Sequence, residues 1–145
     1  VGVRYLFAKR LMKDLGDNVF ISRSVEIQHW HSLSIGSNVS IHKDCYIDAV
    51  GGINIGNDVS IAHASSILTA EHTWADISIP IRSNPISTSA VNISDDVWVG
   101  CGVRILSGVS ISSRVVVAAG SVVITNIKSG SLVAGVPATI KKYIV

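Results

Sequence analysis

The chain has 145 residues and a formal net charge of +2, from 12 Lys and Arg against 10 Asp and Glu. Hydrophobic residues make up 48% of the sequence and charged residues only 15%, which excludes a disordered chain or a highly charged tail. At this length we expect a single domain over residues 1–145. So small a net charge is poor support for nucleic-acid binding, which needs a concentrated basic face.

The cysteines and the apolar runs bear on the compartment. Cys45 and Cys101 are too few for a disulfide framework, so a reducing cytoplasm is the simpler expectation. No run approaches the roughly 18 uninterrupted apolar residues of a membrane span. Residues 1–15 lack the long apolar stretch and the small-residue cleavage site of a secretory signal. The sequence therefore predicts a cytoplasmic protein.

An amphipathic helix is predicted over residues 1–14. Apolar residues recur there at helical spacing, with basic residues opposite them. The apolar set is Val3, Leu6, Phe7, Leu11 and Leu15, and the basic set is Arg4, Lys9, Arg10 and Lys13. We expect the apolar side to cap the coils that follow. Weak association of the basic side with a membrane surface is the alternative.

A six-residue repeat occupies residues 15–67 and 93–126. Its aliphatic positions are Leu15, Ile21, Ile27, Ile35, Ile41, Ile47, Ile55, Ile61, Ile67, Ile93, Val99, Ile105, Ile111, Val117 and Val123. In the first stretch two residues are added after every third hexad, as between Ile27 and Ile35. Three hexads per group predict a three-sided coil, with one short strand on each side and a turn at each corner. Such coils bury their aliphatic residues by stacking about 4.8 Å apart through parallel strands.

Residues 68–92 interrupt the repeat with Pro80, Pro85 and many polar residues. A long loop that leaves a regular scaffold is more often functional than decorative, so we expect an active-site loop there. Residues 127–145 are expected to form a C-terminal segment after the coils. Cys45 falls at a small inward position of its hexad and is interpreted as a core residue. The fold predicted is all-β, with one short helix.

Two motifs accompany the repeat, DVWVG at residues 96–100 and VAGVPA at residues 133–138. Together with the hexads they resemble the hexapeptide-repeat acyltransferases, over residues from about 15 to 142. Within that family the chain is most similar to the maltose and galactoside O-acetyltransferases and to the O-acetyltransferases of bacterial surface-polysaccharide biosynthesis. The resemblance implies a left-handed parallel β-helix and a homotrimer. It also implies active sites between neighbouring subunits, with acetyl-CoA as co-substrate.

His72 stands five residues after Ile67, at the position of the family's catalytic histidine. Transfer of an acyl group from a thioester to a hydroxyl requires removal of one proton as the oxygen attacks. Imidazole titrates near neutral pH and can accept that proton. No covalent acyl-enzyme is needed, so Cys101 is not expected to act as a nucleophile. Glu71 and Asp76 either orient the imidazole ring or are solvated loop charges.

His42, Asp48 and Trp98 are predicted as substrate-binding residues. His42 stands where the family's sugar enzymes carry an acceptor-binding Asn, which leaves the identity of the acceptor open. Asp44 and Asp48 lie on the same coil and could bind hydroxyl groups beside it. Trp98 is expected near the pantetheine arm or the loop, or else as a flat aromatic cover at the trimer contact.

Six positions match the family's contacts with CoA. They are Cys101, Ala119, Ile124, Thr125, Thr139 and Lys142. Thr125 and Thr139 replace a Lys and an Arg of the sugar acetyltransferases, which weakens the inherited phosphate site. Lys141 and Lys142 either supply the missing charge or are solvated side chains.

Other functions are compatible with this fold. An N-acetyltransferase would use the same base on an amino sugar, and an inactive scaffold would bind no CoA. A γ-type carbonic anhydrase needs three His ligands for zinc, and the spacing of His42, His63 and His72 does not match it. We therefore predict an acetyl-CoA-dependent O-acetyltransferase that acts on a sugar or polysaccharide precursor and holds no metal.

Overall fold

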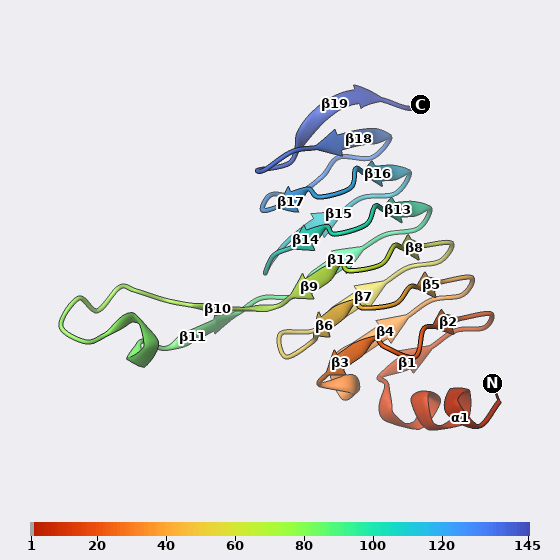
Figure 1. Ribbon diagram of the computed structural model, residues 1–145, viewed down its shortest axis with the longest axis horizontal. Helices are drawn as coiled ribbons and strands as arrows, with labels where there is room; N and C mark the ends of the chain where they lie inside the picture. The colour runs from red at the N-terminus through yellow and green to blue at the C-terminus, as the bar shows by residue number, and fades with distance from the viewer. Residues whose placement is uncertain (1) are drawn as a thin grey trace.

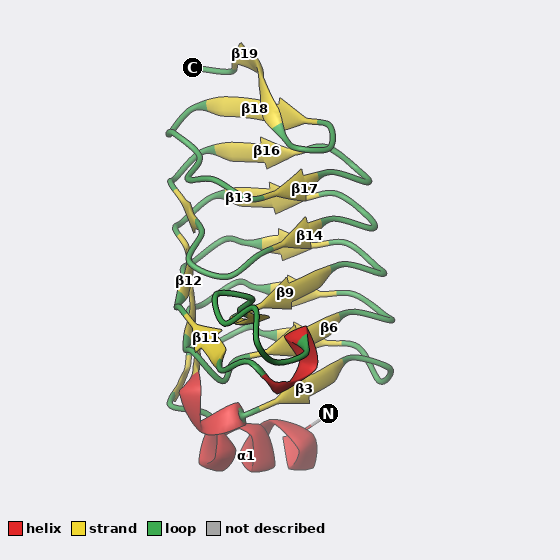
Figure 2. Ribbon diagram, turned by 90° about the vertical axis from the view of Figure 1, so that its left-hand side faces the viewer, coloured by secondary structure: helices red, strands yellow, loops and turns green. Residues whose placement is uncertain are grey.

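The computed structural model describes residues 2–145, and the side chains from Tyr5 onward. It is a three-sided β-solenoid with a helix at one end and one long arm leaving its side (Figure 1). The view turned by 90° shows the coils as a regular stack (Figure 2). The β-coil predicted from the hexads is confirmed.

Three sheets form the faces of the solenoid. The first face contains β1 (Asp14–Leu15), β4 (Leu33–Ile35), β7 (Ile53–Ile55), β12 (Val91–Ile93) and β15 (Ser110–Ile111). The second face contains β2 (Phe20–Ile21), β5 (Ser40–Ile41), β8 (Ser60–Ile61), β13 (Val97–Val99), β16 (Val115–Val117), β18 (Ser131–Ala134) and β19 (Thr139–Tyr143). The third face contains β3 (Glu26–Gln28), β6 (Tyr46–Asp48), β9 (Ser66–Leu68), β14 (Arg104–Ile105) and β17 (Val122–Val123). Neighbouring strands are parallel on every face, except that β19 turns back antiparallel to β18.

The corners between the faces are called edges below. The first edge joins the first face to the second, the second edge joins the second face to the third, and the third edge leads back to the first face. Paired residues are 20 apart in the early coils, as in Leu15 and Ile35, and 18 apart in the later ones, as in Val97 and Val115. The two extra residues of the early coils lie at the third edge, and the arm leaves the solenoid from the same edge.

Aliphatic side chains fill the interior as the repeat predicts. Ile41 and Ile61 lie in register on the second face and are almost completely buried. Cys45 is also inside, at 2% exposure, and burial raises the pKa of its thiol. The coils continue past residue 126, because Ile127 bridges to Ile111 and β18 adds another strand.

The first edge is held by a ladder of polar side chains. Asn18, Asn38 and Asp58 each adopt a positive φ, which Asn and Asp tolerate better than most residues. Asn18 Nδ2 donates to Asn38 Oδ1 at 3.0 Å, and Asn38 Nδ2 donates to Asp58 Oδ1 at 3.0 Å. Glycine precedes each turn because the backbones meet closely there. A Cβ on Gly36 would lie 2.7 Å from the backbone of Gly56.

Helix α1 (Gly2–Leu11) covers part of the solenoid end, but its buried side differs from the prediction. Tyr5 and Ala8 pack against the core, Met12 is buried, and the Tyr5 hydroxyl donates to the Gly16 carbonyl at 3.0 Å. The predicted inward residues Leu6, Phe7 and Leu11 are 63%, 62% and 52% exposed. The side chains of Val3 and Arg4 lie outside the described ones. The prediction was wrong because spacing shows which residues share a helix side, and contacts decide which side packs.

The interruption of the repeat forms an arm. β10 (Ala70–His72) pairs antiparallel with β11 (Ile86–Thr88), and a short 3-10 helix, η2 (Ile81–Ser83), follows the tip. Figure 1 shows this arm projecting away from the stack. A second 3-10 helix, η1 (Trp30–Ser32), lies at the third edge of the first coil. Among residues 2–145, no helix is long and apolar enough to cross a bilayer.

Candidate active site

His72 is the last residue of β10, where the arm leaves the solenoid. The base of the arm is fixed by Thr69, which is fully buried. The Thr69 hydroxyl donates to the Asp48 carbonyl at 2.7 Å and accepts from the Gly51 amide at 2.8 Å. His72 then lies opposite Ile86 in the antiparallel pair, with its side chain exposed. A rigid base therefore holds an accessible imidazole about 10 Å further along the strand.

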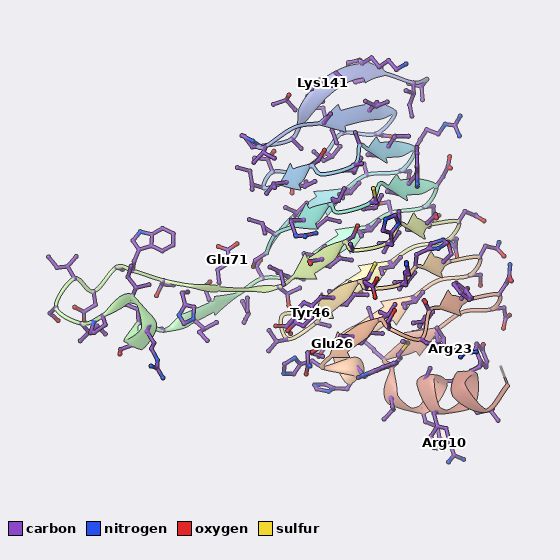
Figure 3. All side chains as sticks on the ribbon, viewed as in Figure 1. Arg10, Arg23, Glu26, Tyr46, Glu71 and Lys141 are labelled. Atoms are coloured by element: carbon purple, nitrogen blue, oxygen red, sulfur yellow. The ribbon has the colours of Figure 1, made fainter. Side chains whose placement is uncertain are left out.

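Neither acidic residue near His72 is placed to orient its imidazole ring. Successive side chains of a strand point to opposite sides, so Glu71 faces away from His72 on β10; Figure 3 labels it on the arm. The Asp76 carboxylate accepts hydrogen bonds from the Ser78 amide at 2.9 Å and the Ser78 hydroxyl at 2.6 Å. These bonds lower the pKa of Asp76. Asp76 thus shapes the arm beyond His72.

The predicted acceptor residues are not brought together within one chain. His42 follows β5 at the second edge, where its ring meets Phe20 edge-on at 6.0 Å between centroids. Asp48 ends β6 beside the third edge, so the third face separates the two side chains. The predicted wall of His42, Asp44 and Asp48 is therefore not formed. Their spacing along the chain did not show that His42 and Asp48 lie at different edges.

Asp48 has a partner that the sequence interpretation missed. Its Oδ1 lies 2.9 Å from His29 Nδ1 and accepts from the Val50 amide at 3.2 Å. His29, interpreted as surface structure, lies almost one coil before Asp48, since Gln28 and Asp48 are paired. The 20-residue coil length could have revealed this contact. The other carboxylate oxygen of Asp48 forms no hydrogen bond to the side chains and backbone that the structure describes.

Residues at equivalent corner positions form a column along the second edge. The Gly102 amide donates to the His63 carbonyl at 3.0 Å, and the Gly120 amide donates to the Cys101 carbonyl at 2.8 Å. His63, Cys101 and Ala119 therefore stand above one another in successive coils. We call these three residues the edge column. Trp98 lies nearby on β13, paired with Ser60 and Val116, and is 54% exposed.

The other predicted CoA positions lie toward the C-terminal end. Ile124 and Thr125 follow β17 at the third edge, away from the edge column. Thr139 and Lys142 lie on β19, where Lys141 Nζ donates to Thr139 Oγ1 at 2.9 Å. Figure 3 shows Lys141 at the end of the solenoid opposite α1. Lys141 is the extra residue of a β-bulge, because Lys142 pairs with Leu132 and Ile140 pairs with Val133.

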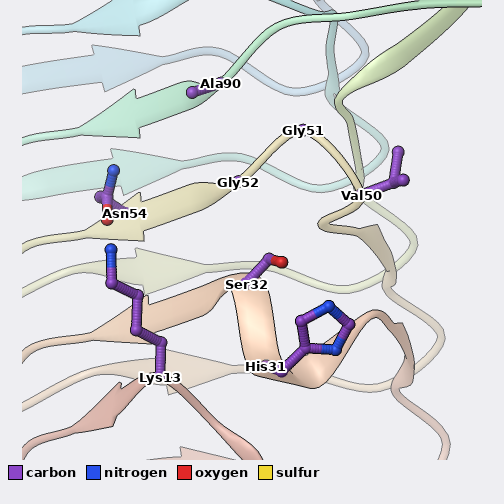
Figure 4. Close-up of a pocket in the computed structure, with 8 residues that line it drawn as sticks. All are labelled: Lys13, His31, Ser32, Val50, Gly51, Gly52, Asn54 and Ala90. Atoms are coloured by element: carbon purple, nitrogen blue, oxygen red, sulfur yellow. The ribbon is translucent and has the colours of Figure 1, made fainter.

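A polar pocket of about 470 Å³ lies on the first face below the arm (Figure 4). It is lined by Lys13, His31, Ser32, Val50, Gly51, Gly52, Asn54 and Ala90. Ala90 closes the arm, so the pocket borders the base from which His72 projects. The sequence interpretation did not include it, because its lining comes from three separate coils. Among the described side chains, no group of three or more His, Cys, Asp and Glu could hold a metal ion.

Solved structures match the solenoid over nearly its whole length. A hexapeptide-repeat acetyltransferase of Vibrio cholerae, complexed with acetyl-CoA, is 28% identical with a TM-score of 0.93, covering 99% of this chain and 78% of that one. A maltose O-acetyltransferase of Clostridium difficile is 29% identical with a TM-score of 0.89, covering 98% and 75%.

Curated relatives agree with this match. The O-acetyl transferase WbbJ of Escherichia coli, named for lipopolysaccharide biosynthesis, is 34% identical over 73% of this chain and 58% of its own length. A relative from Mycobacterium tuberculosis is 33% identical over 79% of this chain, which spans only 38% of that protein. No family model matches the chain. A Saccharomyces cerevisiae protein classed as an acetyltransferase is 32% identical over 94% of this chain and 68% of its own length. The chain therefore belongs to the hexapeptide-repeat acetyltransferases.

Proposed function

We propose that this protein transfers an acetyl group from acetyl-CoA to a hydroxyl of a sugar or polysaccharide precursor. The observation that carries this proposal is the exposed His72 imidazole on an arm whose base is fixed by Thr69. The maltose O-acetyltransferase of Clostridium difficile and WbbJ of Escherichia coli support the sugar hydroxyl as acceptor. Because the chain spans only 58% of WbbJ, we propose the chemical class of the acceptor and not an individual sugar.

In the proposed reaction His72 acts as general base. Its neutral imidazole takes the hydroxyl proton as the acceptor oxygen attacks the thioester carbonyl. The carbon–sulfur bond then breaks, and the proton passes to the departing thiolate, which gives an acetyl ester and free CoA. General-base assistance of this kind contributes roughly 10²- to 10⁴-fold in rate.

The edge column is proposed to hold the pantetheine arm of the donor. Cys101 and Ala119 have small side chains, so a long ligand could lie close to the backbone there. Trp98 offers an exposed ring beside the column. At the C-terminal end, Lys141 and Lys142 would supply the charge for phosphates that Thr125 and Thr139 lack.

A homotrimer would complete this site. His72 leaves from the third edge, and the edge column follows the second edge, so one chain does not bring them together. If the arm of each copy meets the second edge of the next, three copies close a ring with three equal sites. Exposed apolar residues on the arm, among them Trp74, Ile77 and Ile86, suit such a contact.

The compartment proposed is the cytoplasm. Both cysteines are free thiols, as is usual for proteins in a reducing compartment.

The first experiment is calorimetric titration with acetyl-CoA, followed by a transfer assay over sugar acceptors. We expect about one acetyl-CoA bound per chain, and His72→Ala should keep that affinity while losing at least about 100-fold in turnover. Glu71→Gln is the matched control on the same strand and should retain activity. Wild-type turnover in His72→Ala would refute the assignment. Acetylation of amino sugars in preference to hydroxyls would make the protein an N-acetyltransferase, and absence of CoA binding would make it a scaffold.

A further inference from the structure

The end of the solenoid formed by α1 presents large apolar side chains to solvent. Leu6, Phe7 and Leu11 are each more than half exposed, whereas Tyr5 and Ala8 face the core. The outward side of a helix on a globular protein is normally polar. Three large apolar residues on that side mark a surface for interaction.

Basic residues share this end of the molecule. Residues 5–13 include Lys9, Arg10 and Lys13 and no acidic residue. The first 28 residues contain five basic and three acidic residues, so they hold the whole net charge of +2. Among the described side chains, the contacts between basic groups and carboxylates are His29–Asp48 and Arg114–Asp96, so Lys9, Arg10 and Lys13 have no carboxylate partner there. Figure 3 shows Arg10 pointing away from the solenoid.

An apolar groove of about 890 Å³ opens beside the helix. Its lining includes Val19, Phe20, Ile21 and Trp30, and the cations Arg23 and Lys43. The groove exists because α1 covers only part of the first coil. Val19 and Ile21 are partly exposed, while their counterparts one coil later, Val39 and Ile41, are 1% and 0% exposed.

We propose that this end of the solenoid binds the surface of an anionic lipid bilayer. Leu6, Phe7 and Leu11 enter the boundary between headgroups and acyl chains, as the apolar residues of interfacial helices do. Lys9 and Arg10 contact lipid phosphates, and Arg23 lines the groove beside the helix. Charge complementarity selects this occupant, because an apolar partner alone would leave the cations unpaired. The inference does not depend on acetyl transfer.

The test is co-sedimentation of the full chain with vesicles. One set contains phosphatidylcholine and phosphatidylglycerol in equal parts, and the other contains phosphatidylcholine alone. We expect binding to the anionic set that weakens as salt rises, since salt screens the attraction. Lys9→Gln together with Arg10→Gln should weaken binding at least about tenfold. Lys128→Gln, an exposed lysine in the coils farthest from α1, is the control and should bind as the unchanged protein does.

A second variant tests the apolar contribution. Leu6→Gln together with Phe7→Gln should lose most vesicle binding while the thermal unfolding midpoint stays unchanged, because both side chains are exposed. The proposal is overturned if the unchanged chain does not bind anionic vesicles, or if this variant binds them as tightly as the unchanged chain does. A third outcome would also overturn it. If the unchanged chain self-associates in sedimentation velocity but does not bind vesicles, and the variant no longer self-associates, this end is a contact between copies.

Discussion

Individual side chains on the edges differ in accessibility, and this makes the two cysteines useful probes. Cys45 is 2% exposed, while Cys101 lies partly exposed in the edge column. An alkylating reagent reaches only an accessible thiolate. The two thiols therefore report separately on the interior and on the proposed donor site.

Iodoacetamide should modify Cys101 in the native protein and leave Cys45 unmodified until the chain is unfolded. Saturating acetyl-CoA should slow modification of Cys101 several-fold, because the donor would cover the edge column. Mass spectrometry of the two peptides gives both rates, and Cys45 is the internal control. If the rate of Cys101 modification is the same with and without acetyl-CoA, the donor does not bind at the second edge.

Burial of Cys45 also predicts a pH dependence of stability. Its pKa is raised above the ordinary value of 9.0, so the thiol stays protonated in the folded chain when it would ionise in the unfolded one. The stabilising contribution is complete below pH 9 and is lost as the pH rises through the folded pKa. Urea unfolding between pH 8 and pH 10 should show this decline. Cys45→Ala should reduce the slope, and an identical slope would argue against Cys45 as its source.

Asp48 can be tested for an acceptor role apart from its structural one. Asp48→Asn weakens the partly exposed pair with His29, and such pairs contribute about 1 kcal/mol or less. His29→Gln weakens the same pair and keeps the carboxylate, so it is the matched control. If the free oxygen of Asp48 binds a substrate hydroxyl, Asp48→Asn alone should raise the acceptor KM several-fold. Equal KM values in the two variants would restrict Asp48 to a structural role.

At the scale of elements, the turns at the first edge require particular residues, as the strands do. Asn38 has a φ of 59° and hydrogen bonds to the coils on both sides. Asn38→Ala should lower the free energy of unfolding by about 1–2 kcal/mol, through backbone strain and lost bonds. Asn38→Gly loses the same bonds without the strain, so its urea midpoint should fall less. Equal losses would show that the positive φ is not the cause.

At the scale of the whole molecule, the proposal predicts that each active site is divided between two copies. His72→Ala and Cys101→Trp should each be inactive, the second because a large ring fills the edge column. Mixing the two variants through unfolding and refolding should restore activity at about a quarter of the sites if arm and edge come from neighbouring chains. Refolding each variant alone is the control. No recovery from the mixture would place the whole site within one chain, and sedimentation equilibrium would give the number of copies.

The coil, its three faces and most of its inward residues could be predicted from the hexads alone. The sequence also determined the point at which the arm begins. These features follow from a local rule, since alternation within a strand and a polar turn after each hexad fix every side chain as inward or outward. Ile41 and Cys45 could be placed inside from their own hexad, without knowledge of any distant contact.

The buried side of α1 was found only in the folded structure, because it depends on how Tyr5 and Met12 pack against the first coil. The contact between His29 and Asp48 joins neighbouring coils and also became visible only there, although the 20-residue coil length already places the two residues about one coil apart. Phe7 and Leu11 share a helical side because they are four residues apart, yet that side faces solvent because Tyr5 and Met12 pack against the first coil. Periodicity states which residues lie together, and packing alone states what they lie against.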